Sequence, residues 1–135
     1  MSSSLESINL DFKKSFHSVF QKPELIQSFL TKRSNKFDAI IKKEFIRREL
    51  ETDFALVALG GYGRKELFPS SDIDLSIIQF NAKTKKIEDI KDFIGWLWTL
   101  KVKVGHSVRT FKDIEKVTKS DLKEFTSYLS YRIIF

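Results

Sequence analysis

Hydrophobic residues recur every three to four positions through the first fifty residues, which is the spacing of one face of an α-helix. Residues 5–20 contain one such stripe and residues 25–50 contain a second. Because proline is favoured in the first turn of a helix, Pro23 is predicted to open the second one. The Ser34-Asn35 pair in its middle leaves open whether this segment forms one helix or two.

Strand patterns begin after residue 52. Residues 53–59 form a short apolar run that ends at glycines, which is typical of a buried strand. Residues 72–78 and 101–109 alternate and predict a second and a third strand. Between them, residues 86–100 predict a helix whose buried stripe would be Ile87, Ile90, Phe93, Ile94, Leu97 and Trp98.

The end of the chain is predicted to be helical. Thr110 can cap a short helix, and Ser120-Asp121 can start another that runs to the end. This order of elements predicts an α/β or α+β domain with a small sheet flanked by helices. We expect a helical lead-in at 1–52 and a core at 53–135, truncated at its C-terminus because the sequence stops in mid-pattern without a helix stop signal.

Composition narrows the classes of function. The 135 residues suit one domain, and the absence of cysteine excludes disulfides and thiol metal sites, which fits a cytoplasmic protein. No apolar stretch reaches the roughly 18–20 residues of a membrane span, and no secretory signal is present, so no membrane partner is expected. The net charge of +6 is spread among 18 acidic residues without a block of like charges. It indicates an ordinary solvated surface, so a nucleic-acid partner is not expected.

The segment from Leu59 to Leu75 is the most informative for function. Three of the five glycines lie at 60–63, directly after the first predicted strand. A glycine turn lets backbone N–H groups approach phosphate oxygens closely. Asp72 and Asp74 lie two residues apart and therefore on one face of the second strand, where two carboxylates repel each other and favour a cation between them. Together these features predict a site for a nucleoside triphosphate with magnesium.

Residues near the glycine turn are further candidates. Gly60 and Gly61 would contact the phosphates, aided by the N-terminus of any short helix at 63–68; a plain tight turn between strand and helix is a frequent alternative. Arg64 could bind phosphate bidentately or form an ion pair with Glu66 or Asp72.

Four other polar residues have open roles. Ser70 and Ser71 could bind a phosphate or a metal-bound water, or only shape the loop after the proline. His106 and Arg109 lie beside a glycine in the third predicted strand and are possible accessory residues. No P-loop and no dinucleotide-binding fingerprint is present.

Two separated motifs resemble a known family. Leu59-Gly60-Gly61 followed after ten residues by Asp72-Ile73-Asp74 resembles the signature of the DNA polymerase β-like nucleotidyltransferase superfamily. The fuller text G-G-Y-G-R-K-E-L-F-P-S-S-D-I-D-L, with V-G-H-S-V-R-T at 104–110, is similar to the N-terminal domain of the bacterial PII uridylyltransferases. The resemblance covers about residues 53–135.

The resemblance implies a fold and a reaction. The fold would be a small mixed sheet backed by helices. The reaction would transfer UMP from UTP to a tyrosine of the PII nitrogen-regulatory protein, with Mg²⁺ and release of pyrophosphate. Asp72 and Asp74 would be catalytic metal ligands, and Gly60, Gly61 and Arg64 would surround the triphosphate.

The sequence departs from the family pattern at two points. Gly61 stands where the superfamily usually has serine, and residues 101–109 contain no third carboxylate to act as a general base. A nucleotidyltransferase with another acceptor, or a nucleotide-binding module without catalysis, therefore remains an alternative.

Overall fold

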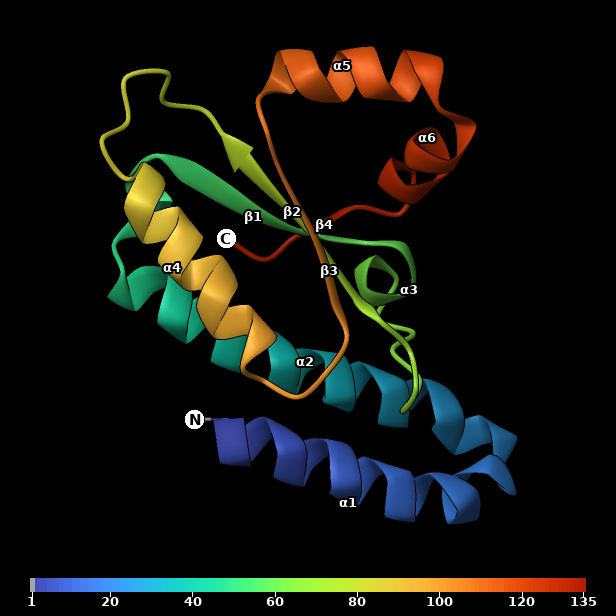
Figure 1. Cartoon of the computed structure of the whole chain (residues 1–135). Coiled ribbons are helices and arrows are strands. Elements are labelled where there is room, and N and C mark those ends of the chain that lie inside the picture. The colour runs from blue at the N-terminus through green and yellow to red at the C-terminus, as the bar shows by residue number, and fades with distance from the viewer. Residues whose placement is uncertain (1) are drawn as a thin grey trace.

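Two long helices form the N-terminal part of the molecule. The computed structural model describes residues 2–135, and the side chains of all of them except residues 2–6, 8 and 9. Helix α1 (Ser2–Phe20) packs against α2 (Pro23–Arg47), and both lie below the sheet in Figure 1. Helix α2 continues unbroken through Ser34-Asn35, with Pro23 in its first turn.

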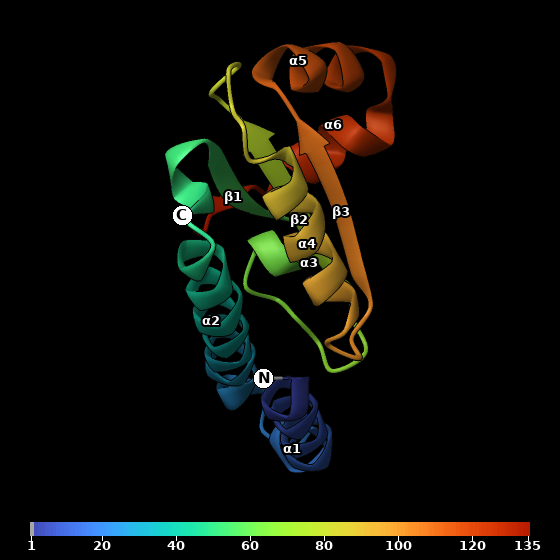
Figure 2. The ribbon, with the colours of Figure 1, turned by 60° about the vertical axis from the view of Figure 1, so that its left-hand side comes forward.

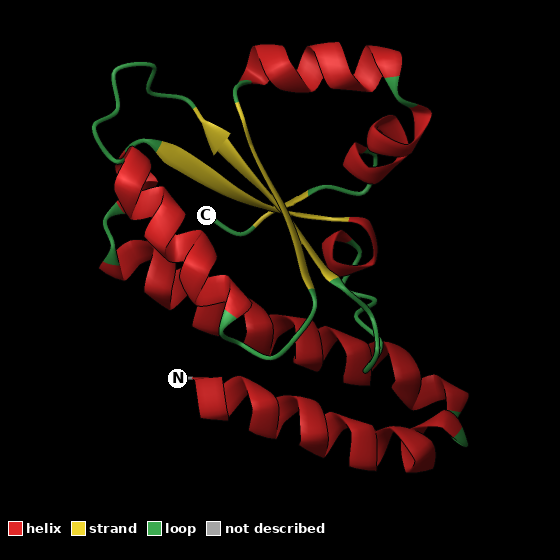
Figure 3. Ribbon diagram, in the orientation of Figure 1, coloured by secondary structure: helices red, strands yellow, loops and turns green. Residues whose placement is uncertain are grey.

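The sheet has four strands within the described residues and is mixed, as the family resemblance implies. Its strands are β1 (Phe54–Leu59), β2 (Ile73–Gln79), β3 (Val104–Arg109) and β4 (Arg132–Ile133), in the order β3-β2-β1-β4. Strands β2 and β3 are parallel, whereas β1 is antiparallel to both β2 and β4. Figure 3 shows the strands crossing at the centre of the molecule, with helices on both sides.

Short and medium helices connect these strands. A single 3₁₀ turn, η1 (Leu50–Thr52), precedes β1, and α3 (Gly60–Gly63) follows it directly. The parallel pair is joined through α4 (Ile87–Trp98), because parallel neighbours need a crossover connection. Helices α5 (Phe111–Ser120) and α6 (Leu122–Tyr128) come after β3. Thr110 caps α5 as predicted, accepting a hydrogen bond from the Asp113 N–H.

The two faces of the sheet pack against different helices. On one face, alternate residues of β1 and β2 join α2 and α4 in the main hydrophobic core, with Phe37, Phe45 and Phe93 completely buried. Burial of each such phenylalanine contributes about 1.5–3 kcal/mol. The other face has a small cluster of Val57, Leu59 and Ile78, against which residues of α5 and α6 pack. Figure 2 shows α5 and α6 together, away from α1 and α2.

Three expectations about these elements were wrong. Ile87 and Trp98 are 42% and 65% exposed, so the buried stripe of α4 is narrower than predicted. Strand β3 begins at Val104 because Lys101 has a left-handed φ of 55°, which breaks the extended backbone.

The third wrong expectation is that the helix starting at Ser120-Asp121 runs to the end of the chain. The final helix ends at Tyr128, and the chain returns as β4 to pair with β1. The Leu56 carbonyl accepts hydrogen bonds from the N–H groups of Ile134 and Phe135. Pairing with β1 therefore satisfies backbone groups that a last helical turn would leave unpaired. No helix among the described residues is long and apolar enough to cross a membrane.

Candidate active site

The glycine turn is built by close backbone packing. Gly60 has a φ of +58°, which residues with a side chain rarely adopt. A Cβ at Gly63 would lie 2.0 Å from the Ser130 carbonyl oxygen and 2.9 Å from that of Ala58. Only glycine lets the segment after α6 cross the turn at this distance.

A partly buried polar cluster fixes the turn to the rest of the molecule. The Tyr62 hydroxyl donates a hydrogen bond of 2.5 Å to Asp38 on α2. Arg132 on β4 pairs with Asp38 at 2.5 Å and donates to the carbonyls of Tyr62 and Gly63. Burial and the neighbouring Asp38 raise the pKa of Tyr62 well above its ordinary value, so the phenol stays protonated. The backbone of the turn is therefore rigidly placed.

Asp74 lies between two glycines. In the sheet it pairs with Leu59 on one side and with Gly105 on the other. A Cβ at Gly60 would lie 3.4 Å from Asp74 Oδ2, and a Cβ at Gly105 would lie 2.7 Å from Asp74 Oδ1. The structure therefore brings Asp74 next to the glycine turn and leaves its carboxylate flanked by bare backbone.

Asp72 affects the ionisation of Asp74. Asp72 lies just before β2 and pairs with Lys103 at 3.3 Å. Partial burial raises the pKa of Asp74, and the charge of Asp72 raises it further, while Lys123 and Lys103 act in the opposite direction. The two carboxylates are thus close enough to repel, and a bound cation would relieve that repulsion.

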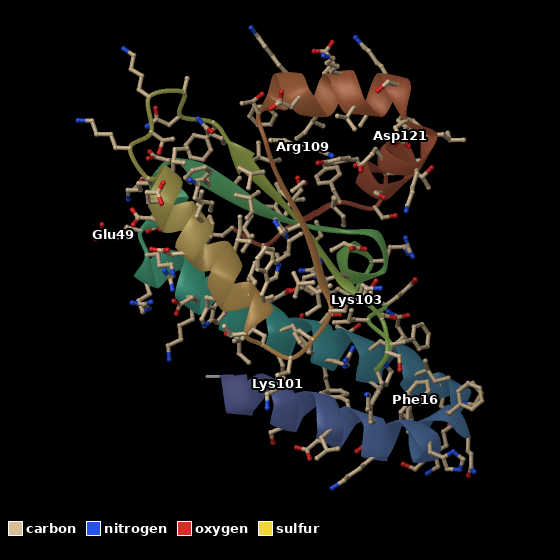
Figure 4. The ribbon with its side chains drawn as sticks, in the orientation of Figure 1. Phe16, Glu49, Lys101, Lys103, Arg109 and Asp121 are labelled. Carbon is tan, nitrogen blue, oxygen red and sulfur yellow. The ribbon has the colours of Figure 1, made fainter. Side chains whose placement is uncertain are left out.

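A cavity of about 450 Å³ contains both aspartates. Its walls come from the ends of β1, β2 and β3 and from helix α6, and its lining residues are Leu59, Asp72, Asp74, Leu75, Gly105, His106, Ser107, Arg109, Lys123, Glu124 and Ser127. Arg109 pairs with Glu124 at 2.8 Å, and this hydrogen bond raises the pKa of Arg109. Arg109 is thus already engaged by α6 through Glu124. Figure 4 labels Arg109 below α5.

Sequence reasoning missed the contribution of α6. Lys123 lines this cavity and also a neighbouring one of about 420 Å³, whose lining includes Gly60 and Arg64. Glu124 is the carboxylate that lines the first cavity besides the two aspartates. The sequence contained one indication of where these two residues lie, because Asp121 is a favourable N-cap residue. Its side chain accepts hydrogen bonds from the N–H groups of Lys123 and Glu124 at the start of α6.

Arg64 lies at the second cavity, but its side chain has partners. Its Nε donates to Glu66 at 3.0 Å and its Nη1 donates to Ser130 at 3.1 Å. Of the two ion pairs considered from the sequence, the one with Glu66 is therefore formed. Arg64 is 49% exposed, so this pair is weak and can rearrange when a phosphate approaches.

Two of the candidate residues point elsewhere. His106 lines the cavity, yet its ring lies 5.5 Å from that of Trp98 on α4, on the opposite face of the sheet from Asp74. Ser71 lines a different cavity, of about 260 Å³, together with Lys13 and Arg33.

The short helix near the glycine turn lies at Gly60–Gly63 rather than at 63–68, so it contains the glycines themselves. With four residues it is too short for a substantial helix dipole.

The donor set fits a magnesium-bound nucleotide. The described residues contain no group of three or more His, Cys, Asp or Glu side chains that could hold a metal. Mg²⁺ is commonly bound through one or two carboxylates, with waters and substrate phosphates as its other ligands. Asp72 and Asp74 line the same cavity, and the charge of Asp72 contributes to the raised pKa of Asp74; together they supply two carboxylates.

Comparison with known proteins defines the class. The model of the nucleotidyltransferase domain family matches residues 39–129, and the chain belongs to this family. Among curated proteins, it is 32% identical over 123 residues to a bifunctional uridylyltransferase/uridylyl-removing enzyme of Cupriavidus pinatubonensis. It is 35% identical over 127 residues to the enzyme of that name from Pseudoalteromonas translucida, and 36% over 121 residues to that from Haemophilus influenzae.

These matches cover most of this chain and a small part of the relatives. The three alignments include 87–92% of the chain but only 13–14% of the relatives' length. The mixed α/β fold and the family together establish a nucleotidyltransferase related to the uridylyltransferases.

Proposed function

We propose that the chain transfers UMP from UTP to a hydroxyl group, on a tyrosine of the PII signalling protein, and releases pyrophosphate. The observation that supports this best is that Asp72 and Asp74 line one cavity, with the Asp74 carboxylate next to Gly60. The uridylyltransferase relatives support UTP as the nucleotide. A cytoplasmic location and a role in nitrogen regulation stay predictions.

The proposed roles follow from position. Asp72 and Asp74 would hold Mg²⁺, which when bound neutralises charge on the phosphates. Gly60 and Gly61 would allow the triphosphate to lie against the backbone, and Lys123, which lines both cavities, would bind phosphate oxygens between them. Arg64 would exchange its ion pair with Glu66 for a phosphate.

The acceptor hydroxyl attacks the α-phosphorus, and the bond to the bridging oxygen of the pyrophosphate breaks. Glu124 lines the cavity and is held in place by Arg109. It is proposed to orient that hydroxyl and to accept its proton as the bond to phosphorus forms. It would take the place of the third carboxylate that residues 101–109 lack.

Binding of a nucleotide without transfer is the second candidate function. It is favoured by the Lys103–Asp72 pair, since a lysine at a metal ligand opposes metal binding. It predicts saturable UTP binding with no pyrophosphate release.

Measuring pyrophosphate release distinguishes transfer to PII, transfer to another acceptor and nucleotide binding without transfer. The assay is run with UTP and PII, with UTP and other acceptors, and with ATP in place of UTP. Mg²⁺-dependent release with UTP and PII, lost in Asp74→Asn and retained in the exposed control Asp92→Asn, is the expected result. Equal turnover by the chain and by Asp74→Asn would contradict the proposal. Release with another acceptor only would change the substrate and leave the reaction class in place.

A further inference from the structure

A chain of hydrogen bonds joins helix α6 to the sheet beside the candidate active site. Arg109, at the end of β3, donates from Nη1 to Glu124 Oε2 at 2.8 Å and to the Tyr128 hydroxyl at 3.4 Å. The Tyr128 hydroxyl also lies 2.8 Å from Ser76 Oγ on β2, where either atom can be the donor. Helix α6 lies beside β3 in Figure 2, and these bonds connect it to two neighbouring strands.

The two ends of this chain of hydrogen bonds adjoin carboxylates of the cavity. Ser76 follows Asp74 by two positions on β2, so both side chains lie on the same face of the sheet. Tyr128 follows Glu124 by four positions, so both lie on one face of the helix. Ser76 is completely buried, and the Tyr128 ring packs against the small apolar cluster on this face of the sheet.

We propose that Tyr128 is a positioning residue, which restrains Arg109 and through it keeps Glu124 at a fixed place relative to Asp74. Arg109 Nη1 is shared between Glu124 and the Tyr128 hydroxyl, so the hydroxyl limits the directions in which Nη1 can point. Tyr128 is itself held by packing at its ring and by Ser76 at its hydroxyl.

The expected effect is moderate, because the contact from Arg109 to Tyr128 is longer than the one to Glu124. Its loss should loosen Arg109 without releasing it. A small misplacement of a group that handles the acceptor proton is enough to slow a reaction. This consequence for UMP transfer rests on the proposed function, whereas the restraint of Arg109 does not.

Arginine side-chain NMR of the full chain tests that restraint without nucleotide or turnover. The Nη signals of Arg109, assigned by their loss in Arg109→Lys, report how fast the guanidinium rotates about its Cζ–Nε bond. Tyr128→Phe keeps the ring and removes the hydroxyl, and it is expected to speed this rotation at least about twofold, the scale of one weak hydrogen bond. An unchanged rotation rate would overturn the proposal.

Steady-state kinetics of the same variant test the consequence for transfer. In Tyr128→Phe, kcat is expected to fall about threefold to tenfold while KM for UTP stays within about twofold, because the proposed phosphate contacts are retained. Tyr131→Phe, at a tyrosine that is 62% exposed and outside the cavity, is the matched control expected to change neither. Equal kcat in Tyr128→Phe and the unchanged chain would overturn the proposal. Absence of transfer by the unchanged chain would instead contradict the proposed function, and the NMR result would still decide whether Tyr128 restrains Arg109.

A double variant separates positioning from stability. Tyr128→Phe leaves the buried Ser76 hydroxyl without this partner, so the urea midpoint of unfolding is expected to fall. Combining it with Ser76→Ala removes both partners and should recover most of the midpoint. The kcat of the double variant is expected to stay low, because Arg109 still lacks the Tyr128 hydroxyl. Recovery of kcat together with the midpoint would overturn the proposal, since Tyr128 would then act only through the stability of the fold.

Discussion

The side chains on the two faces of strand β2 lie in different environments. Ile73, Leu75 and Ile77 point into the main core and are at most 2% exposed. Asp74, between them, points to the other face, where its carboxylate borders a cavity. The core face combines residues from α2 and α4, whereas α5 and α6 contain no fully buried residue. The side chains that stabilise the core and the carboxylate proposed to take part in the reaction therefore lie on opposite faces of one strand.

Truncating the core should have the largest effect. Phe93 is completely buried and packs edge-on against Phe45 with 5.5 Å between ring centroids. Phe93→Ala is expected to lower the free energy of unfolding by about 3–5 kcal/mol through lost burial and a new cavity. Urea unfolding measures it, and Phe111→Ala, at a side chain 65% exposed, is the control expected to stay within about 0.5 kcal/mol. Similar losses in both variants would refute the division between the faces.

Replacing Asp74 on the polar face of β2 should reduce activity without lowering the free energy of unfolding. Asp74→Asn is expected to reduce UMP transfer at least about 100-fold, the scale of one lost electrostatic contact to a transition state. Its free energy of unfolding should not fall, because the ionised carboxylate is partly desolvated and repelled by Asp72. Steady-state kinetics and urea unfolding of the same preparation check both. A large loss of stability would show that Asp74 supports the fold.

Adding one methyl group beside Asp74 should have an intermediate effect. In Gly105→Ala the new Cβ would lie 2.7 Å from Asp74 Oδ1, so the carboxylate must move. Turnover is expected to fall about tenfold, since small misplacements at a reacting centre are costly. Gly95→Ala on α4 is the matched control, because its Cβ meets nothing within 4 Å. It should stabilise the helix by about 0.5–1 kcal/mol and leave kcat unchanged.

The smallest effect should be the pH dependence of stability. Because the folded chain raises the pKa of Asp74 above its unfolded value, ionised Asp74 destabilises the fold at neutral pH. The penalty should disappear as the pH falls through the folded pKa towards the ordinary value of 3.8. Asp74→Asn should therefore be more stable than the unchanged chain at pH 7, by less than about 1 kcal/mol given its exposure, and the difference should shrink in acid. A difference that grows in acid would reverse the assigned direction, and Asp92→Asn should show none.

Local sequence signals predicted most elements because they depend on near neighbours. Pro23 opens α2, Thr110 caps α5, and alternation places Asp72 and Asp74 on the same side of the strand. The resemblance of two motifs to a known family also predicted a nucleotidyltransferase, which the family comparison confirms. Roles of individual residues in that site stay predictions.

Long-range packing decided what the spacing could not. The Ile133 region is apolar enough to continue a helix, but pairing with β1 makes it a strand. Ser71 immediately precedes Asp72, yet it lines a separate cavity of about 260 Å³ next to α1 and α2. The ring of His106 lies 5.5 Å from that of Trp98.

Residues that could bind phosphate and metal can be recognised in the sequence alone, because glycine turns and paired carboxylates are local features. The residues that surround them are set by long-range packing. Lys123 and Glu124 enter the cavity from α6, about fifty residues after Asp74 in the chain. The bare backbone of Gly105 leaves room for Asp74 through the parallel pairing of β2 with β3. Such contacts depend on the order of strands in the sheet, and no local pattern specifies that order.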